Sequence, residues 1–167
     1  MPMTKHQRQS YAASVMAGLS CLMPGWTDRV GKFRHYQSAI RCKAVSENVL
    51  CFAQITVCAP RGTGPDTLSI GVGWTDDLLY DESMPIEFER PTAILDVLIS
   101  REDAPDWSRI RSYVGIEHLK RRGGIFYGLN VGLGIEPEEV VEVIKSDFAA
   151  FGLKFLKEFV RRKGLSL

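Results

Sequence analysis

The chain has 167 residues, a formal net charge of +1 and a mean hydropathy of −0.06. Hydrophobic and charged contents of 45% and 25% are ordinary for one soluble globular domain, which we expect to span residues 1–167. Because no run reaches the ~18 apolar residues of a membrane span, and the N-terminus lacks the apolar core of a secretory signal, we expect a cytoplasmic protein without membrane association.

A helix is predicted near the N-terminus. Thr4 and Gln7 have the spacing of a capping box, in which two side chains satisfy unpaired backbone amides. Apolar residues then recur at helical spacing, and Pro24 ends the helix. The recurring positions are Tyr11, Ala12, Val15, Met16, Leu19 and Leu22.

A strand-rich block follows this helix. In residues 40–44, apolar side chains alternate with Arg41 and Lys43, which predicts a half-buried strand whose outer face is basic. Residues 49–58 are apolar at both parities, so this second strand should be central in its sheet. Residues 46–48 supply the turn between the two strands.

Two later segments combine large and very small side chains. Residues 68–75 and 125–133 place glycine or a small polar residue at most alternate positions, so each predicted strand has one nearly bare face. Such a face, which carries Gly71 and Gly73 in the first segment, lets a helix or a ligand approach the backbone closely. We expect a helix, rather than a ligand, to pack on these bare faces. Residues 92–100 are compatible with either a short helix or a buried strand.

A long helix is predicted near the C-terminus. Pro137 suits its first position, and Glu138 complements the positive end of the helix dipole. The apolar stripe keeps its phase through Gly152, so we predict one helix, with any bend at that glycine. The dipole also explains the basic residues 161–163 in the last turn, before a C-cap glycine at Gly164. The stripe consists of Val140, Ile144, Phe148, Phe151, Phe155 and Phe159.

These elements predict an α+β fold. A mainly antiparallel sheet should be flanked by the N-terminal helix and by the long amphipathic C-terminal helix. We expect the C-terminal stripe to lie on the large-residue face of the sheet, over Leu68, Ile70 and Val72.

The cysteines and histidines carry no recognisable chemistry. The cysteines have no C-x-x-C spacing, and three of them lie in apolar stretches, so we expect reduced thiols and a buried Cys51. His6, His35 and His118 are isolated from metal-ligand and nucleophile motifs. The sequence therefore indicates no cofactor, no metal and no catalytic residue. The cysteines are Cys21, Cys42, Cys51 and Cys58.

The charge of the chain is sorted along its length. Residues 66–106 carry eleven acidic side chains and two basic ones, a local charge of −9. Residues 1–65 sum to +6 and residues 107–167 to +4. Segregated charge steers partners and sets association rates. We therefore predict a non-enzymatic binding or inhibitor protein that uses an acidic surface to bind a basic protein partner.

The acidic stretch after the predicted 68–75 strand is the candidate protein-binding site. Aromatic side chains anchor protein interfaces, and carboxylates select a basic partner. The same stretch is compatible with a solvated loop whose tryptophan belongs to the core. It is also compatible with a divalent-metal site, although the spacing matches no calcium loop. The candidate residues are Trp74, Asp76, Asp77, Tyr80, Asp81 and Glu82.

A nucleic-acid surface is the alternative. Basic and aromatic side chains lie next to each other just before the first predicted strand, as they do in some nucleic-acid-binding surfaces. The residues of this alternative site are Arg34, His35, Tyr36, Arg41 and Lys43. A small enzyme whose site is assembled from distant residues is the third hypothesis.

The order of these elements resembles small uncharacterised bacterial α+β domains. The resemblance rests on the capped helix, the motif that joins Phe33 and Arg34 to Tyr36, the apolar hairpin, the glycine-bearing strand and the helix containing Phe151 and Gly152. Some of those domains belong to immunity- or inhibitor-type proteins. The resemblance implies a binding role and transfers no site residue.

Overall fold

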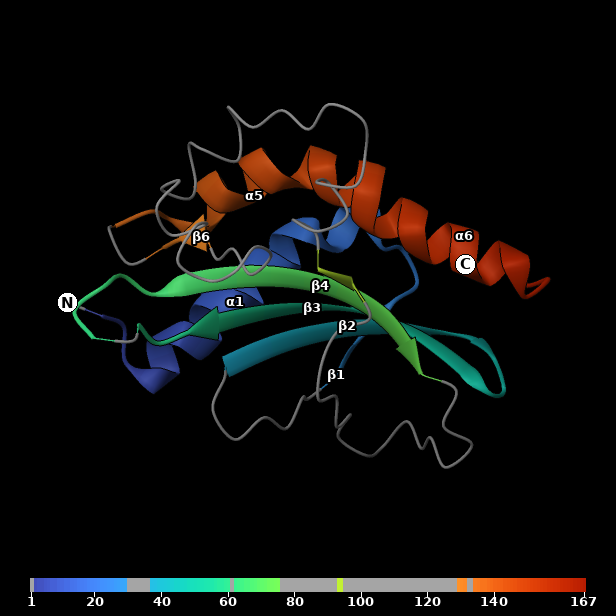
Figure 1. Ribbon diagram of the computed structural model, residues 1–167, viewed down its shortest axis with the longest axis horizontal. Helices are drawn as coiled ribbons and strands as arrows, with labels where there is room; N and C mark the ends of the chain where they lie inside the picture. The colour runs from blue at the N-terminus through green and yellow to red at the C-terminus, as the bar shows by residue number, and fades with distance from the viewer. Residues whose placement is uncertain (1, 30–36, 61, 76–92, 95–128, 132–133) are drawn as a thin grey trace.

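The fold is given by a computed structural model. The residues that it describes are 2–29, 37–60, 62–75, 93–94, 129–131 and 134–167. They form an antiparallel sheet with helices packed on one face, so the predicted α+β class is confirmed (Figure 1). Within these ranges, no helix has the length and apolar character needed to cross a membrane.

Helix α1 spans Lys5–Leu19 and begins at the predicted capping box. The Gln7 backbone amide donates to Thr4 Oγ1 at 3.2 Å, and the Thr4 amide donates to Gln7 Oε1 at 2.8 Å. A 3-10 turn at Ser20–Leu22 follows, and Gly25 then adopts a φ of +77°, in the left-handed region that favours glycine. The helix buries Ala12, Val15, Met16 and Leu19.

The sheet has the strand order β1-β2-β3-β4-β5, and every pairing is antiparallel. β3 lies between β2 and β4, so the prediction that residues 49–58 form a central strand is confirmed. A short strand, β6, pairs with β4 at Thr67 and Leu68. The strands are β1 (Thr27–Arg29), β2 (Gln37–Ser46), β3 (Val49–Cys58), β4 (Thr67–Thr75), β5 (Ala93–Ile94) and β6 (Leu129–Asn130).

The C-terminal helical segment is continuous but changes its helix type. α5 (Pro137–Asp147) leads into a π-helical turn (Phe148–Leu153) and then into α6 (Lys154–Arg162). As predicted, Pro137 occupies the first turn, and Gly164, with a φ of +72°, follows the last one. The helices lie along the sheet on the same side as α1 (Figure 1).

The π-helical turn shifts the buried face of the helix. The buried large side chains step from Phe148 to Leu153, an interval of five, with the buried Gly152 between them, and a π turn closes its hydrogen bonds from i to i+5. The predicted phase is therefore wrong beyond Phe148: Phe151, Phe155 and Phe159 are only half-buried at the margin of the core. The buried positions are Val140, Ile144, Phe148, Leu153, Leu156 and Val160.

Gly152 lets this turn approach the sheet. A Cβ at that position would lie 3.2 Å from the Phe148 ring and 3.5 Å from a methyl group of Val72 on β4. A Cβ there would be in ordinary contact with Val72, and the Phe148 ring would have to move by a few tenths of an ångström. The glycine therefore allows close packing between the helical segment and β4.

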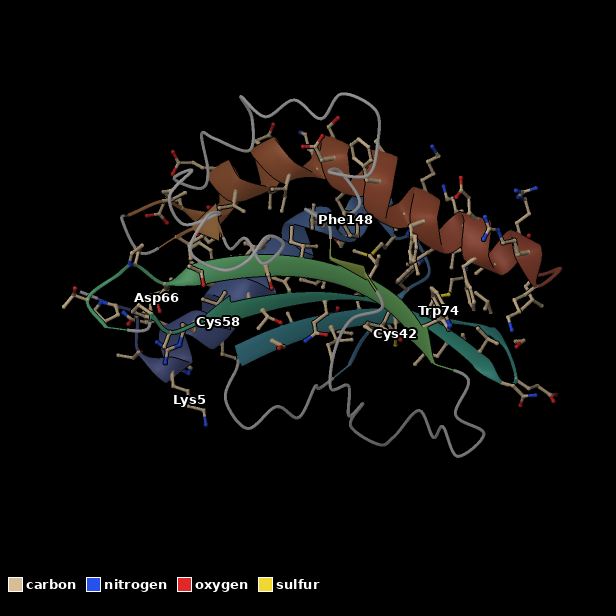
Figure 2. The ribbon with its side chains drawn as sticks, in the orientation of Figure 1. Lys5, Cys42, Cys58, Asp66, Trp74 and Phe148 are labelled. Carbon is tan, nitrogen blue, oxygen red and sulfur yellow. The ribbon has the colours of Figure 1, made fainter. Side chains whose placement is uncertain are left out.

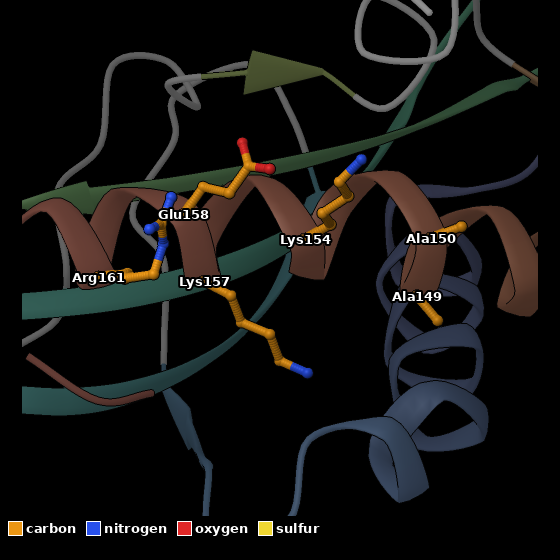
Figure 3. A pocket seen from close by; sticks show the side chains of 6 residues that line it. All are labelled: Ala149, Ala150, Lys154, Lys157, Glu158 and Arg161. Atoms are coloured by element: carbon orange, nitrogen blue, oxygen red, sulfur yellow. The ribbon is translucent and has the colours of Figure 1, made fainter.

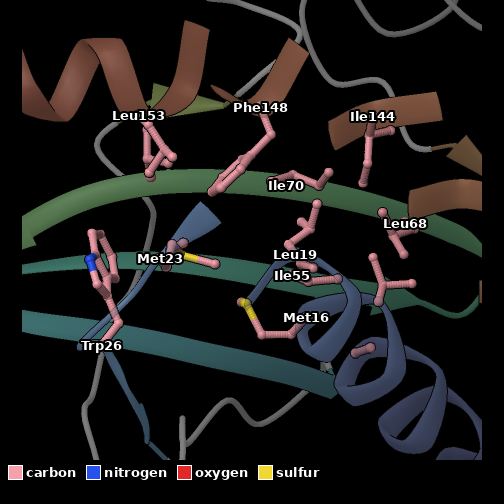
Figure 4. Close-up of a cluster of buried hydrophobic side chains, with 14 of the residues drawn as sticks. Met16, Leu19, Met23, Trp26, Ile55, Leu68, Ile70, Ile144, Phe148 and Leu153 are labelled. Carbon is pink, nitrogen blue, oxygen red and sulfur yellow. The ribbon is translucent and has the colours of Figure 1, made fainter. Parts of the chain in front are cut away.

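The main core lies between the sheet and the helices. Phe148, Leu19 and Ile55 are fully buried in it and come from the C-terminal segment, α1 and β3 (Figure 4). Leu68, Ile70 and Val72 belong to the same cluster. The prediction that the C-terminal helix covers the large-residue face of β4 is therefore confirmed.

The opposite face of the sheet has a different composition. Gly71 and Gly73 pair with Gln54 and Phe52 of β3, and both glycines are buried. Because α1, α5 and α6 cover the other face, they do not account for these bare positions, and the expectation of a helix over the glycines is wrong for the described helices. Large side chains, rather than glycines, fill the layer beneath the helices. A second buried cluster on the glycine face consists of Ile40, Cys42, Leu50 and Phe52.

Candidate functional site

Trp74 is the one predicted protein-binding residue in the described part of the chain. It lies at the C-terminal end of β4 (Figure 2), and its ring stacks on Phe159 of α6, with centroids 3.6 Å apart and an interplanar angle of 12°. A second ring, Phe155, lies 5.7 Å away. The half-buried tryptophan thus makes an intramolecular contact at the margin of the core, as expected if its strand parity places it there. The other predicted residues, Asp76, Asp77, Tyr80, Asp81 and Glu82, lie outside the described residues.

The Trp74 stack continues with a cation. Lys163 Nζ lies 5.8 Å from the centroid of Phe159, a cation–π distance. Aromatic stacking therefore packs the C-terminal end of β4 against α6. The acidic run begins in sequence directly after this strand.

Asp66 is an acidic residue of the middle segment that is not available to a partner. Its side chain is 0% exposed. Oδ2 accepts from the Met3 backbone amide at 2.6 Å, and Oδ1 accepts from Arg8 Nη1 at 3.2 Å. The Asp66 carbonyl also accepts from the Val131 amide. This carboxylate joins the N-terminal segment to the sheet, so it is a structural residue.

The alternative nucleic-acid residues are only partly described. Arg41 lies on the helix-facing side of β2, where its Nη2 donates to the Trp26 carbonyl at 3.1 Å and its Nη1 lies 3.6 Å from Asp28 Oδ1. Its side chain is 19% exposed, and its Nε is buried without a hydrogen-bond partner among the described residues. Arg34, His35 and Tyr36 lie outside the described residues.

The predicted alternation of apolar and basic side chains along β2 is confirmed, but the basic side chains lie on the helix-facing side of the sheet instead of the outer side. Ile40 and Cys42 are buried in the second cluster, away from the helices. Arg41 and Lys43 are half-buried on the opposite side, so the basic face is not the outer face of the sheet. Lys43 pairs with Cys51, which pairs in turn with Trp74. This row places Lys43 about 10 Å from Trp74, two strand spacings away.

A buried polar group lies on the glycine face. Gln54 is 3% exposed and pairs with Gly71 of β4. Its Nε2 donates to Ser38 Oγ at 3.3 Å and to Thr56 Oγ1 at 3.1 Å, while Oε1 has no hydrogen-bond partner. Buried polar atoms are usually paired, so Gln54 Oε1 and Arg41 Nε are exceptions within the described sheet. Sequence periodicity gives no warning of it, because Gln54 lies in an apolar strand.

Two described groups have shifted pKa values. Burial raises the pKa of the Cys51 thiol to about 11, which keeps it protonated and unreactive at neutral pH. Desolvation, and then the nearby carboxylate of Glu136, raises the pKa of Tyr11 to about 12. The Tyr11 hydroxyl donates to the Ile135 carbonyl at 2.7 Å and so joins α1 to the start of α5. All four cysteines are free thiols, and Cys51 is buried, as the strand pattern predicts.

α6 and the residue that follows it carry exposed cations, and we define the basic α6 face by Lys154, Lys157, Arg161, Arg162 and Lys163. Part of it borders a depression of about 370 Å³ (Figure 3). Sequence reasoning attributed the last three cations to the helix dipole and overlooked the first two. The overlooked signal was the excess of cations before the last helical turn. The depression is lined by Ala149, Ala150, Lys154, Lys157, Glu158 and Arg161.

The comparisons with known proteins leave the function to be argued from these residues. No protein-family model, curated protein or solved structure matches the chain. Within the part of the chain that the structure describes, no three His, Cys, Asp or Glu side chains gather to hold a metal ion.

Proposed function

We propose that the protein is a cytoplasmic, non-enzymatic binding protein of the inhibitor type that occludes a basic protein partner. The observation that carries this proposal is the excess of negative charge in residues 76–106. That segment contains ten acidic side chains and two basic ones. A concentrated field of one sign accelerates encounter with an oppositely charged partner and disfavours partners of the same sign.

The charges elsewhere in the described chain support this proposal. Asp66 pairs with Arg8, and Glu142 pairs with Lys145 at 2.8 Å. These two carboxylates have basic partners within the fold, whereas residues 76–106 themselves contain only two basic side chains for ten acidic ones. The segment also follows β4, which hydrogen-bonds to β3 on one side and to β5 and β6 on the other. The residue before the segment, Thr75, is therefore held in the sheet.

The proposal is tested by charge reversal with a matched control. The test variant carries Asp76→Lys, Asp77→Lys and Asp81→Lys. The control variant carries Glu47→Lys, Glu138→Lys and Glu142→Lys, at three exposed positions outside the segment. Both variants change the net charge by the same amount, so a general charge effect would affect them equally.

The first measurement is capture from native bacterial lysate at low salt, followed by purification of the basic protein retained by the parent. Association rates with that protein are then measured by stopped-flow fluorescence. We expect the test variant to associate at least about tenfold more slowly, and the control to remain within about twofold of the parent. Equal slowing in both variants, or retention of acidic proteins only, would contradict the proposal.

The strand-based nucleic-acid surface is not proposed as a second function. Arg41, its best-described member, already contacts the Trp26 carbonyl and Asp28. Releasing those contacts would leave polar groups unpaired beside the core.

A further inference from the structure

The basic α6 face is made of residues outside the acidic 76–106 segment, and the proposed function gives it no role. The apolar side of α6 buries Leu156 and Val160 against the sheet. Four exposed cations, Lys154, Lys157, Arg161 and Arg162, therefore belong to the remaining side of an amphipathic helix. Lys163 directly follows the helix and lies over the Phe159 ring.

The helix dipole does not account for this face. Dipole effects act within the last turn, which covers residues 161–163. Lys157 lies before that turn and is exposed. Neither Lys157 nor Arg161 forms an ion pair with any described residue. Like charges four residues apart on a helix, such as Lys157 and Arg161, repel each other and lower the stability of the helix slightly. Because this pair does not stabilise the fold, we infer that it serves binding.

The shape of the helix adds a second observation. Ala149 and Ala150, in the π-helical turn, leave a low surface next to longer side chains. Lys154 and Lys157 follow these alanines along the helix and project in different directions, and both line the same depression (Figure 3). The resulting depression of about 370 Å³ has room for a phosphate group with its sugar.

We propose that the basic α6 face binds the phosphate backbone of a nucleic acid without regard to sequence. From Lys154 to Arg161 the helix rises about 10 Å, close to the axial length of three nucleotides in one DNA strand. Exposed Lys and Arg side chains are the groups that neutralise backbone phosphates and release their counterions. Glu158 within the depression opposes such binding and limits its strength.

The same face is a poor match for a membrane or for a hydrophobic partner groove. A membrane-surface helix places large apolar side chains beside its cations. Among the described residues, the exposed large hydrophobic side chain is Ile135, which precedes α5. The large apolar side chains of α6 nearest these cations, Phe155 and Phe159, are half-buried and pack against Trp74, so the face offers mainly charge, which suits a nucleic-acid backbone.

The test uses the full chain and a fluorescein-labelled 16-base-pair DNA duplex of mixed sequence. Fluorescence anisotropy is measured between about 30 and 200 mM salt. The face variant carries Lys157→Ala and Arg161→Ala. The control carries Lys5→Ala and Lys145→Ala, which remove the same charge at exposed positions outside α6. Thermal melting confirms that all variants are folded.

We expect the parent to bind the duplex at low salt with a clear salt dependence. The face variant should bind about 10- to 60-fold more weakly at 100 mM salt, and its logarithmic salt slope should decrease by nearly two. The control should remain within about threefold of the parent. Glu158→Gln should strengthen binding severalfold, an effect that a loss of structure would not produce.

Three results would overturn the proposal. One is the absence of duplex binding by the parent at about 30 mM salt. Another is an equal loss in the face and control variants. The third is binding to vesicles containing one-quarter phosphatidylserine, lost in the face variant, without binding to DNA. Charge reversal at Asp76, Asp77 and Asp81 should not weaken DNA binding, which separates this proposal from the protein-binding function.

Discussion

Replacing Leu156 with alanine should destabilise the protein strongly, although Leu156 lies outside the apolar stripe that the sequence displays. The side chain is 0% exposed and belongs to the main core. Leu156→Ala removes three buried carbons, which account for roughly 2.4 kcal/mol of transfer free energy at about 0.8 kcal/mol each. The cavity left behind raises the total to about 3–4 kcal/mol.

The measurement is urea unfolding followed by tryptophan fluorescence, with Lys157→Ala as the exposed neighbour. For a chain of this length, a loss of about 3 kcal/mol corresponds to a melting temperature lower by roughly 6–12 °C. The control should change the free energy of unfolding by less than about 0.5 kcal/mol. If Leu156→Ala costs under about 1 kcal/mol, the π-helical turn does not rotate α6 as described.

Three further predictions concern individual contacts. Asp66→Asn should lower the free energy of unfolding by about 1–3 kcal/mol, because it weakens the buried hydrogen bonds from Met3 and Arg8 to the carboxylate. An unchanged urea midpoint would contradict a structural role for Asp66. Native Cys51 should resist iodoacetamide at pH 8 while exposed Cys21 reacts, as peptide mass spectrometry would show; the reverse order would be incompatible with the burial that raises the pKa of Cys51 to about 11. Tyr11 has a folded-state pKa raised from 10.0 to about 12, so its contribution is complete below pH 10 and is lost as the pH rises through 12. Tyr11→Phe should therefore lose the hydrogen bond to Ile135, at about 1 kcal/mol, and show a shallower decline in stability between pH 10 and 12 than the parent.

Local signals in the sequence were sufficient for the elements that depend on neighbouring residues. The capping box of Thr4 and Gln7 is made by atoms three residues apart, so its spacing alone defines the start of α1. Pro137 marks the start of α5 in the same way. Strand parity also gave the alternative in which Trp74, predicted as a protein-binding residue, belongs to the core, and the structure packs its ring against α6 at the core margin.

The helix phase beyond Phe148 was decided by tertiary contacts. An uninterrupted α-helix would direct Phe151 and Phe155 into the core. The sequence also contains a second stripe at helical spacing, Leu153, Leu156 and Val160, and spacing alone does not choose between the two. The structure instead buries Leu153, because a π turn with Gly152 against Val72 brings the segment closer to β4. Packing against a curved sheet thus overrode the local period.

Charge depended on tertiary structure even more strongly. Counting places Asp66 in the acidic segment and Arg8 in the basic flank, although the two side chains lie 3.2 Å apart. Arg41, counted with an outer basic face, points to the helix side and contacts Trp26. A sequence determines which charges are present and how strand faces alternate. Only the fold decides which carboxylates are buried and paired, because Coulomb interactions depend on distances in space and on exclusion of water.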